Sequence, residues 1–134
     1  MERRVITLGR RWEGAALFSL GVVSPGQTLH TAGITARDAD GNVVGVGDMC
    51  RQVAQCFATL GAILDAAGAT WNDVVKYLIF TTDIVRYDHE TREVRAPYFV
   101  GKPAATLVEV RGLIHPDLLV EVEAVVSLRL AAQV

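Results

Sequence analysis

The sequence contains few of the residues on which disulfide-bonded, metal-dependent or nucleic-acid-binding proteins depend. Its two cysteines, Cys50 and Cys56, would point in different directions on one helix and cannot pair. Its three histidines, His30, His89 and His115, form no ligand-spaced pair, so we expect no metal site. Thirteen basic and fifteen acidic residues leave a formal net charge of −2, which argues against electrostatic binding of nucleic acid.

Long apolar runs are missing as well. No run approaches 18 residues, so we expect no membrane span, and with no secretory signal we expect a cytoplasmic, reducing environment. Aromatic residues make up only 7% of the chain, while hydrophobic residues make up 51% and charged residues 21%. This composition is typical of a globular protein, and 134 residues predict one domain over residues 1–134.

Apolar periodicity predicts one long helix. Apolar residues recur at spacings of three and four between Asp48, a plausible N-cap, and Gly68, a C-terminal stop, so we expect a helix over residues 48–67. A second helix is expected from a cap at Asp88 to about Phe99. Pro97 predicts that it kinks or ends near residue 95, because proline cannot donate the helical hydrogen bond.

Alternation and turn residues predict the strands. They are expected over residues 4–8, 16–23, 28–32, 74–82, 104–110 and 119–128. The second and third of these, joined by Ser24-Pro25-Gly26-Gln27, are predicted to form a hairpin. The order of elements predicts an α+β fold with a single mixed sheet and two helices packed on one face.

The strands are apolar on both sides, so the other face of the sheet must also be covered. Leu78, Phe80, Leu107 and Val126 cannot all face the helices. A small domain with a spare apolar sheet face usually forms oligomers, and we therefore expect self-association.

Five short motifs, taken in their order and spacing, resemble those of the RidA (YjgF) family between about residues 18 and 128. They are Thr31-Ala32-Gly33, Asp73-Val74-Val75-Lys76, Thr82-Asp83, Pro103-Ala104-Ala105-Thr106 and Val120-Glu121-Val122-Glu123-Ala124, and the predicted helix with Gln52 and Ala67-Gly68 adds to them. The resemblance implies a chorismate-mutase-like fold and a homotrimer with small-molecule clefts between its subunits. It also implies hydrolysis of imines or enamines, such as 2-aminoacrylate, to a keto acid and ammonia without a cofactor.

The residue after Pro103-Ala104 departs from the family pattern. Active deaminases carry an arginine there, which can hold the carboxylate of an imino acid with two hydrogen bonds. Here the residue is Ala105, which offers neither charge nor donor. The chain therefore resembles a branch that lacks the deaminase arginine, and ordinary 2-aminoacrylate deamination is not expected.

Two further positions match the family. Glu121 corresponds to the acidic residue that orients the attacking water, although Glu123 has the same strand parity and alternation alone does not separate them. A solvent-facing charge is the plain alternative for either residue. Gly33 corresponds to a glycine whose backbone approaches the ligand, and a tight bend would explain it equally well.

Other candidate positions make the implied cleft less polar. Phe18 stands where the deaminases commonly have tyrosine, Ile34 replaces a usual glutamine and Leu107 a usual cysteine. Arg92 corresponds to a polar cleft residue on the second helix and could supply the missing charge. Its plain alternative is a solvated helix face shared with Glu93 and Arg95.

The sequence leaves several functions open. The resemblance favours a small-molecule enzyme that uses general acid–base chemistry, with Glu121 catalytic. A non-catalytic metabolite-binding or chaperone-like trimer is the alternative, because the fold is retained without its anchor. A ribonuclease, a label that some relatives carry, fits least well, since the chain has neither excess positive charge nor paired catalytic histidines.

Overall fold

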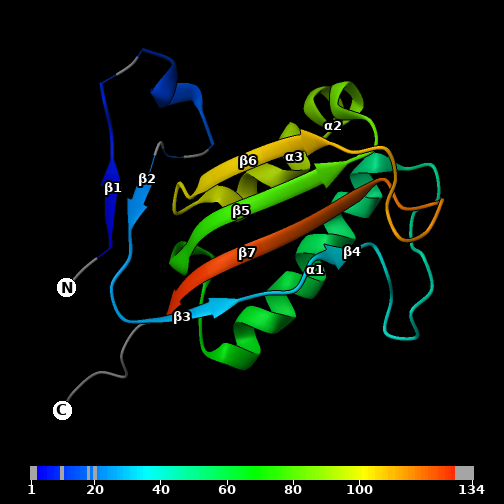
Figure 1. The fold of residues 1–134 in the computed structure, drawn as a ribbon, viewed down its shortest axis with the longest axis horizontal. Helices are drawn as coiled ribbons and strands as arrows, with labels where there is room; N and C mark the ends of the chain where they lie inside the picture. The colour runs from blue at the N-terminus through cyan, green and yellow to red at the C-terminus, as the bar shows by residue number, and fades with distance from the viewer. Residues whose placement is uncertain (1–2, 10, 18, 20, 129–134) are drawn as a thin grey trace.

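A five-stranded mixed sheet carries three helices on one face (Figure 1). This computed structural model describes the chain except residues 1–2, 10, 18, 20 and 129–134. The strand order is β3 (Gln27–His30), β7 (Val120–Leu128), β5 (Val74–Thr81), β6 (Ala104–Glu109). The short β4 (Ile34–Thr35) pairs with β7 beyond the end of β3. Only the β5–β6 pair is parallel, so the predicted mixed α+β sheet is confirmed.

The first long helix, α1 (Met49–Ala67), agrees with the predicted range of 48–67. The Asp48 carboxylate accepts a hydrogen bond from the backbone N–H of Arg51 at 3.0 Å, which satisfies a donor at the helix start. Gly68 ends the helix with φ +73°, a left-handed conformation that glycine adopts without steric cost. The capping residues identified in the sequence therefore set both ends of α1.

The second predicted helix is wrong in its start and in its continuity. Helix α2 (Ile84–Glu90) begins five residues earlier than expected, because the Asp83 carboxylate, rather than that of Asp88, caps it by accepting a hydrogen bond from the N–H of Arg86 at 3.1 Å. A short helix α3 (Arg92–Arg95) and the 3₁₀ turn η3 (Ala96–Phe99) follow. Pro97 lies in the first turn of η3, where a backbone N–H would have no acceptor within the helix, so its absence costs no hydrogen bond. The expected early end near residue 95 is thus confirmed.

The predicted N-terminal hairpin is also wrong. Strand β2 (Gly21–Val23) pairs with β1 (Arg4–Ile6) in a separate two-stranded ribbon, with the 3₁₀ turn η1 (Arg11–Ala15) between them in the chain. Strand β3 pairs instead with β7. The turn before β3 is tied to β7, because Ser127 Oγ donates to the carbonyl of Pro25 at 2.9 Å. Strand β3 therefore pairs with a strand that is distant in the sequence and not with β2, its neighbour in the sequence.

The helices cover one face of the sheet, and the other face is more exposed (Figure 1). Tyr77 and Ile79 on β5 are buried beneath the helices, whereas Leu78 and Phe80 alternate with them and face the other way, only half-buried. Leu107 packs on the helix side. The expectation that the apolar strand residues divide between two faces is confirmed, and the described residues leave one of these faces open.

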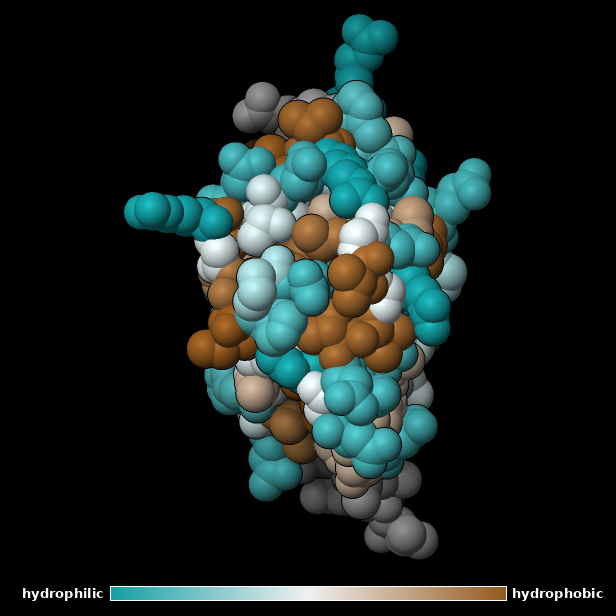
Figure 2. Space-filling model, turned by 90° about the vertical axis from the view of Figure 1, so that its right-hand side faces the viewer, coloured by the Kyte–Doolittle hydropathy of each residue, from teal (hydrophilic) through white to brown (hydrophobic). Residues whose placement is uncertain are grey.

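Apolar side chains also gather at the end of the molecule where the loop before α1 and the β6–β7 loop lie (Figure 2). Two of the large exposed apolar residues are in these loops, Val46 (63% exposed) and Ile114 (84% exposed). None of the described helices is both long and apolar enough to cross a bilayer.

Candidate functional site

A cavity of about 350 Å³ lies between strand β6 and the helices α2 and α3, and we call it the β6 cavity. Its strand wall consists of Ile79 on β5 and of Ala105 and Leu107 on β6. Ala16 and Leu17, which precede β2, line another side. The volume is at the lower end of the range for cavities that hold small organic ligands.

The helix wall of the β6 cavity carries its polar groups, and Phe99 adds an apolar ring. Arg92, one of the predicted site residues, lies on this wall, so the structure brings it together with Ala105 and Leu107. Its side chain is exposed, and Nη2 donates to the carbonyl of Ala15 at 2.7 Å. Arg92 thereby ties the N-terminal segment to α3 at the edge of the cavity.

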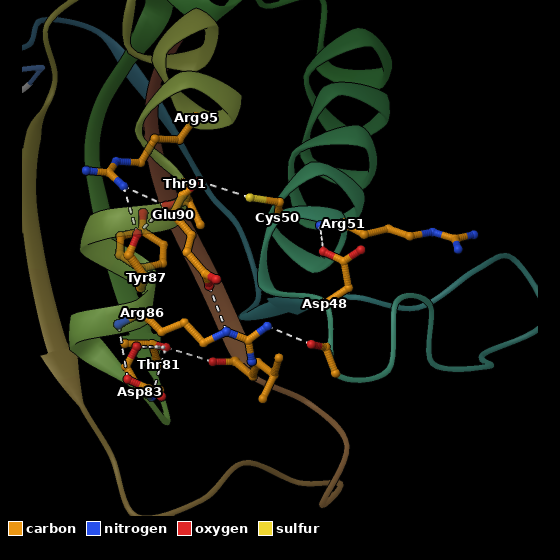
Figure 3. A network of polar contacts seen from close by, with 12 residues as sticks. Asp48, Cys50, Arg51, Thr81, Asp83, Arg86, Tyr87, Glu90, Thr91 and Arg95 are labelled. Carbon is orange, nitrogen blue, oxygen red and sulfur yellow. Dashed lines mark hydrogen bonds and ion pairs between the residues drawn. The ribbon is translucent and has the colours of Figure 1, made fainter.

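Arg95 is a cavity residue that the sequence interpretation missed, because it was assigned to a solvated helix face. Its residue exposure is only 9%, and Nη1 donates to Thr91 Oγ1 at 2.6 Å and to the Tyr87 carbonyl at 3.1 Å. Its guanidinium carbon lies 4.8 Å from the centre of the Tyr87 ring (Figure 3). Nη2 is 3.8 Å from the carboxylate of Asp88.

A signal for this arrangement is present in the sequence. Tyr87, Thr91 and Arg95 follow one another at intervals of four, which places them on one side of a continuous helical path. The predicted helix start at Asp88 left Tyr87 outside the helix and hid the pattern.

Tyr87 is 2% exposed, and its hydroxyl has no hydrogen-bond partner among the residues that the structure describes. Burial is the main cause that raises the pKa of the Tyr87 phenol to about 12, and the nearby Arg95 acts in the opposite direction. The phenol is therefore neutral at physiological pH and can act there only as a hydrogen-bonding group or as packing.

Three other predicted site residues, Gly33, Ile34 and Glu121, lie at or next to the opposite, β4 side of the sheet. Glu121 on β7 is in register with Thr35 on β4, and its carboxylate lies against the backbone of Gly33. A Cβ atom added at Gly33 would be 2.2 Å from Glu121 Oε2, so any larger residue would displace the carboxylate. Glycine is required here by a close approach, and the group that approaches is the side chain of Glu121.

These two groups of residues do not form one site within a single chain. Gly33 and Ile34 line a different hollow, of about 460 Å³, between β4 and α1. Ile34 and Leu107 lie in one cross-strand row with β7 and β5 between them, so they are about 14 Å apart. Glu121 is on the open face of the sheet, whereas the β6 cavity is on the helix face.

Comparison with known proteins decides the family. The family model described as endoribonuclease L-PSP, the RidA/YjgF family, matches residues 9–128. The chain belongs to this family. A Rid-family protein of unknown function from Yersinia pestis, YyfB, is 32% identical over 96% of this chain and all of its own, with a TM-score of 0.83. Rv2704 from Mycobacterium tuberculosis, of the YjgF/YER057c/UK114 family, is 34% identical over 95% of this chain and 100% of its own, with a TM-score of 0.65.

Another structure that the chain resembles contains a bound small molecule. TdcF from E. coli with bound serine is 25% identical over 84% of this chain and 88% of its own, with a TM-score of 0.67. In this protein Ala105 stands where the resemblance expects an arginine, and it lines the β6 cavity. Phe18, another expected ligand contact, lies outside the described residues.

Other reactive side chains of this RidA/YjgF chain are engaged structurally. Cys56 is fully buried, and burial, with the charge of Glu121 as a smaller cause, raises the pKa of its thiol to about 12. It is protonated at neutral pH and serves as a core residue. His115 accepts from the N–H of Asp117 at 3.0 Å in the β6–β7 loop.

Proposed function

We propose that the protein is a cofactor-independent RidA-like enzyme that acts on a small imine, enamine or related carbonyl compound by general acid–base chemistry. The reaction takes place in a cleft between subunits of a homotrimer. The observation that carries this proposal is the separation of the site into two halves at opposite edges of one sheet. A cavity lined by Ala105 and Leu107 and a carboxylate at Glu121 meet only if two copies of the chain adjoin.

The open face of the sheet supports the assembly. Leu78 and Phe80 are only half-buried on a face that no described element covers, and the two glutamates Glu121 and Glu123 share that face. Burying such a face against a second copy removes apolar surface from water, a favourable change of about 25 cal/mol per Å². The resemblance implies a homotrimer with clefts between its subunits, and the proposed site requires that the β4 side of one subunit lies beside the β6 edge of the next.

In this arrangement Glu121 supplies the base. It accepts a proton from water as the water oxygen adds to the imine carbon, and the imine nitrogen takes up a proton. The resulting carbinolamine collapses to a carbonyl compound, and the nitrogen leaves as ammonia. Water and imine are consumed and carbonyl compound and ammonia are formed, so the reaction balances without a cofactor. Gly33 leaves room for this carboxylate, because a Cβ atom at residue 33 would occupy the same space.

The substrate is distinguished from 2-aminoacrylate by the wall of the cavity. Ala105 and Leu107, together with Ile79 and Phe99, present an apolar surface where the deaminase pattern places a strand arginine. A substrate with a larger apolar body than 2-aminoacrylate gains contact with this surface. The serine bound to TdcF supports a ligand of amino-acid size on this fold.

The experiment compares wild type with Glu121→Gln and Glu123→Gln. The imines, 2-iminopropionate and a bulkier apolar imine, are generated in situ, and ammonia release is followed. Glu123 is the matched control, because it is two residues away on the same strand and face. We expect hydrolysis of the bulkier imine by wild type, a loss of about 10²–10⁴-fold in Glu121→Gln, and little change in Glu123→Gln. Equal rates for wild type and Glu121→Gln would contradict the assigned role.

A metabolite-binding trimer without turnover is the second candidate, and the absence of the strand anchor at Ala105 favours it. The same experiment separates the two functions. If no imine is hydrolysed by wild type while a small ligand binds to the cavity, the protein is a binding module and the catalytic proposal fails.

A further inference from the structure

We propose that Arg95 is the anion anchor of the β6 cavity and selects ligands that carry a single carboxylate on an apolar body. This inference rests on the proposed function only in taking the cavity as the ligand site. The family resemblance expects the positive charge at the position of Ala105, on a strand. The inference assigns this charge instead to an arginine on a helix. Its ground is the placement of a buried guanidinium on the wall of an apolar cavity.

The guanidinium of Arg95 is held in a fixed position. Nη1 donates hydrogen bonds to Thr91 Oγ1 and to the Tyr87 carbonyl, and the Tyr87 ring lies beneath the guanidinium (Figure 3). These contacts come from one helical path, since the three residues are spaced by four. A guanidinium immobilised before binding loses little conformational freedom when a ligand arrives, which favours selective recognition.

The same guanidinium has N–H groups that donate no hydrogen bond to a described residue. Of its five N–H groups, those on Nη1 make the hydrogen bonds found to described residues, and the nearest carboxylate, that of Asp88, is 3.8 Å from Nη2. That separation is beyond hydrogen-bond range, and the Asp88 side chain is 65% exposed. A buried cation without a hydrogen-bonded counterion is unfavourable, and a carboxylate that enters the cavity would supply one.

The charge of the cavity indicates the charge of the ligand. Its ionised groups are Arg92 and Arg95, both positive, and Asp88, negative, so their sum is +1. Arg92 is exposed and holds Ala15 through Nη2, which leaves Arg95 as the buried member of the pair. One negative charge on the ligand neutralises this sum, whereas a dianion would leave excess charge in a largely apolar space.

Binding of benzoate and benzamide tests the assignment. The two molecules are nearly equal in shape and differ in charge, and calorimetry on the assembled protein gives both affinities. We expect wild type to prefer benzoate by about tenfold or more, as for a charge-assisted hydrogen bond. Arg95→Met should abolish the preference, Arg95→Lys should retain part of it, and Arg92→Met should reduce it less than Arg95→Met does, because Arg92 is exposed to solvent.

Asp88→Asn provides a second test in case Arg95→Met does not fold. Because the Asp88 carboxylate is near Nη2 of Arg95, its neutralisation should tighten benzoate binding severalfold and leave benzamide binding unchanged. The inference is overturned if wild type binds benzoate and benzamide equally. It is also overturned if Arg92→Met alone removes the preference, or if Asp88→Asn leaves benzoate affinity unchanged.

The outcomes remain distinct from those of the imine assay. Selective benzoate binding that depends on Arg95, without imine hydrolysis, supports the anchor and contradicts the proposed reaction. Hydrolysis of apolar imines without benzoate preference supports the reaction and contradicts the anchor.

Discussion

Replacing Tyr87 by phenylalanine removes one buried hydroxyl and leaves the aromatic ring beneath Arg95. The hydroxyl is buried without a hydrogen-bond partner among the described residues, in a side chain that is 2% exposed. Burying a hydroxyl without a partner costs about 1–3 kcal/mol. Phenylalanine keeps the ring whose centre is 4.8 Å from the Arg95 guanidinium carbon. We therefore expect Tyr87→Phe to raise the free energy of unfolding by about 1 kcal/mol or more.

Thermal and urea unfolding measure this change, with wild type and variant at the same protein concentration because assembly makes Tm depend on concentration. A gain of 1 kcal/mol corresponds to roughly 2–8 °C in Tm for a chain of this size. The matched control is Tyr77→Phe. The Tyr77 hydroxyl is also buried, but it donates to the Tyr98 carbonyl at 2.8 Å, so its removal should destabilise the protein by about 1–2 kcal/mol. A Tyr87→Phe variant destabilised as much as Tyr77→Phe would refute the reasoning.

Two further substitutions and one thiol-labelling experiment test other parts of the structure. Gly33→Ala should displace the Glu121 carboxylate and lower turnover at least tenfold in the imine assay, while circular dichroism stays unchanged. Gln52→Leu removes three hydrogen bonds of 2.8–3.1 Å from a fully buried amide, and urea unfolding should show a loss of about 2–5 kcal/mol. With its pKa near 12, Cys56 should stay unmodified by a thiol reagent at pH 8 in the native protein, where the half-buried Cys50 reacts. Two equally fast thiols would show that the core opens.

Local signals predicted the elements whose ends are set by their own residues. Asp48 and Gly68 marked the ends of α1 because capping is a contact between neighbours in sequence. The alternation around Glu121 and Glu123 marked β7 because one face of that strand is buried throughout. The N-terminal hairpin failed since pairing of β3 with β7 joins residues about a hundred positions apart.

The site was predicted only in part for a similar reason. Ala105, Leu107 and Arg92 line one cavity, although nothing in their spacing along the sequence brings them together. Arg95 was missed because two aspartates compete to cap the second helix, and Asp83 caps it. Because the predicted helix began too late, Tyr87 was left out of it, and Arg95 was assigned to a solvated face although it lies on a buried wall.

The measurement that tests the central claim most directly is complementation between two inactive variants. Glu121→Gln removes the base, and Ala105→Trp fills the β6 cavity, so each trimer alone should fail to hydrolyse the apolar imine. After the two are unfolded together and refolded as an equal mixture, about one quarter of the clefts should combine an intact Glu121 with an intact cavity from the neighbouring subunit. Recovery of about one quarter of wild-type activity is the predicted result. A mixture no more active than its separate components, with mixed trimers shown by mass spectrometry, would contradict a site shared between subunits.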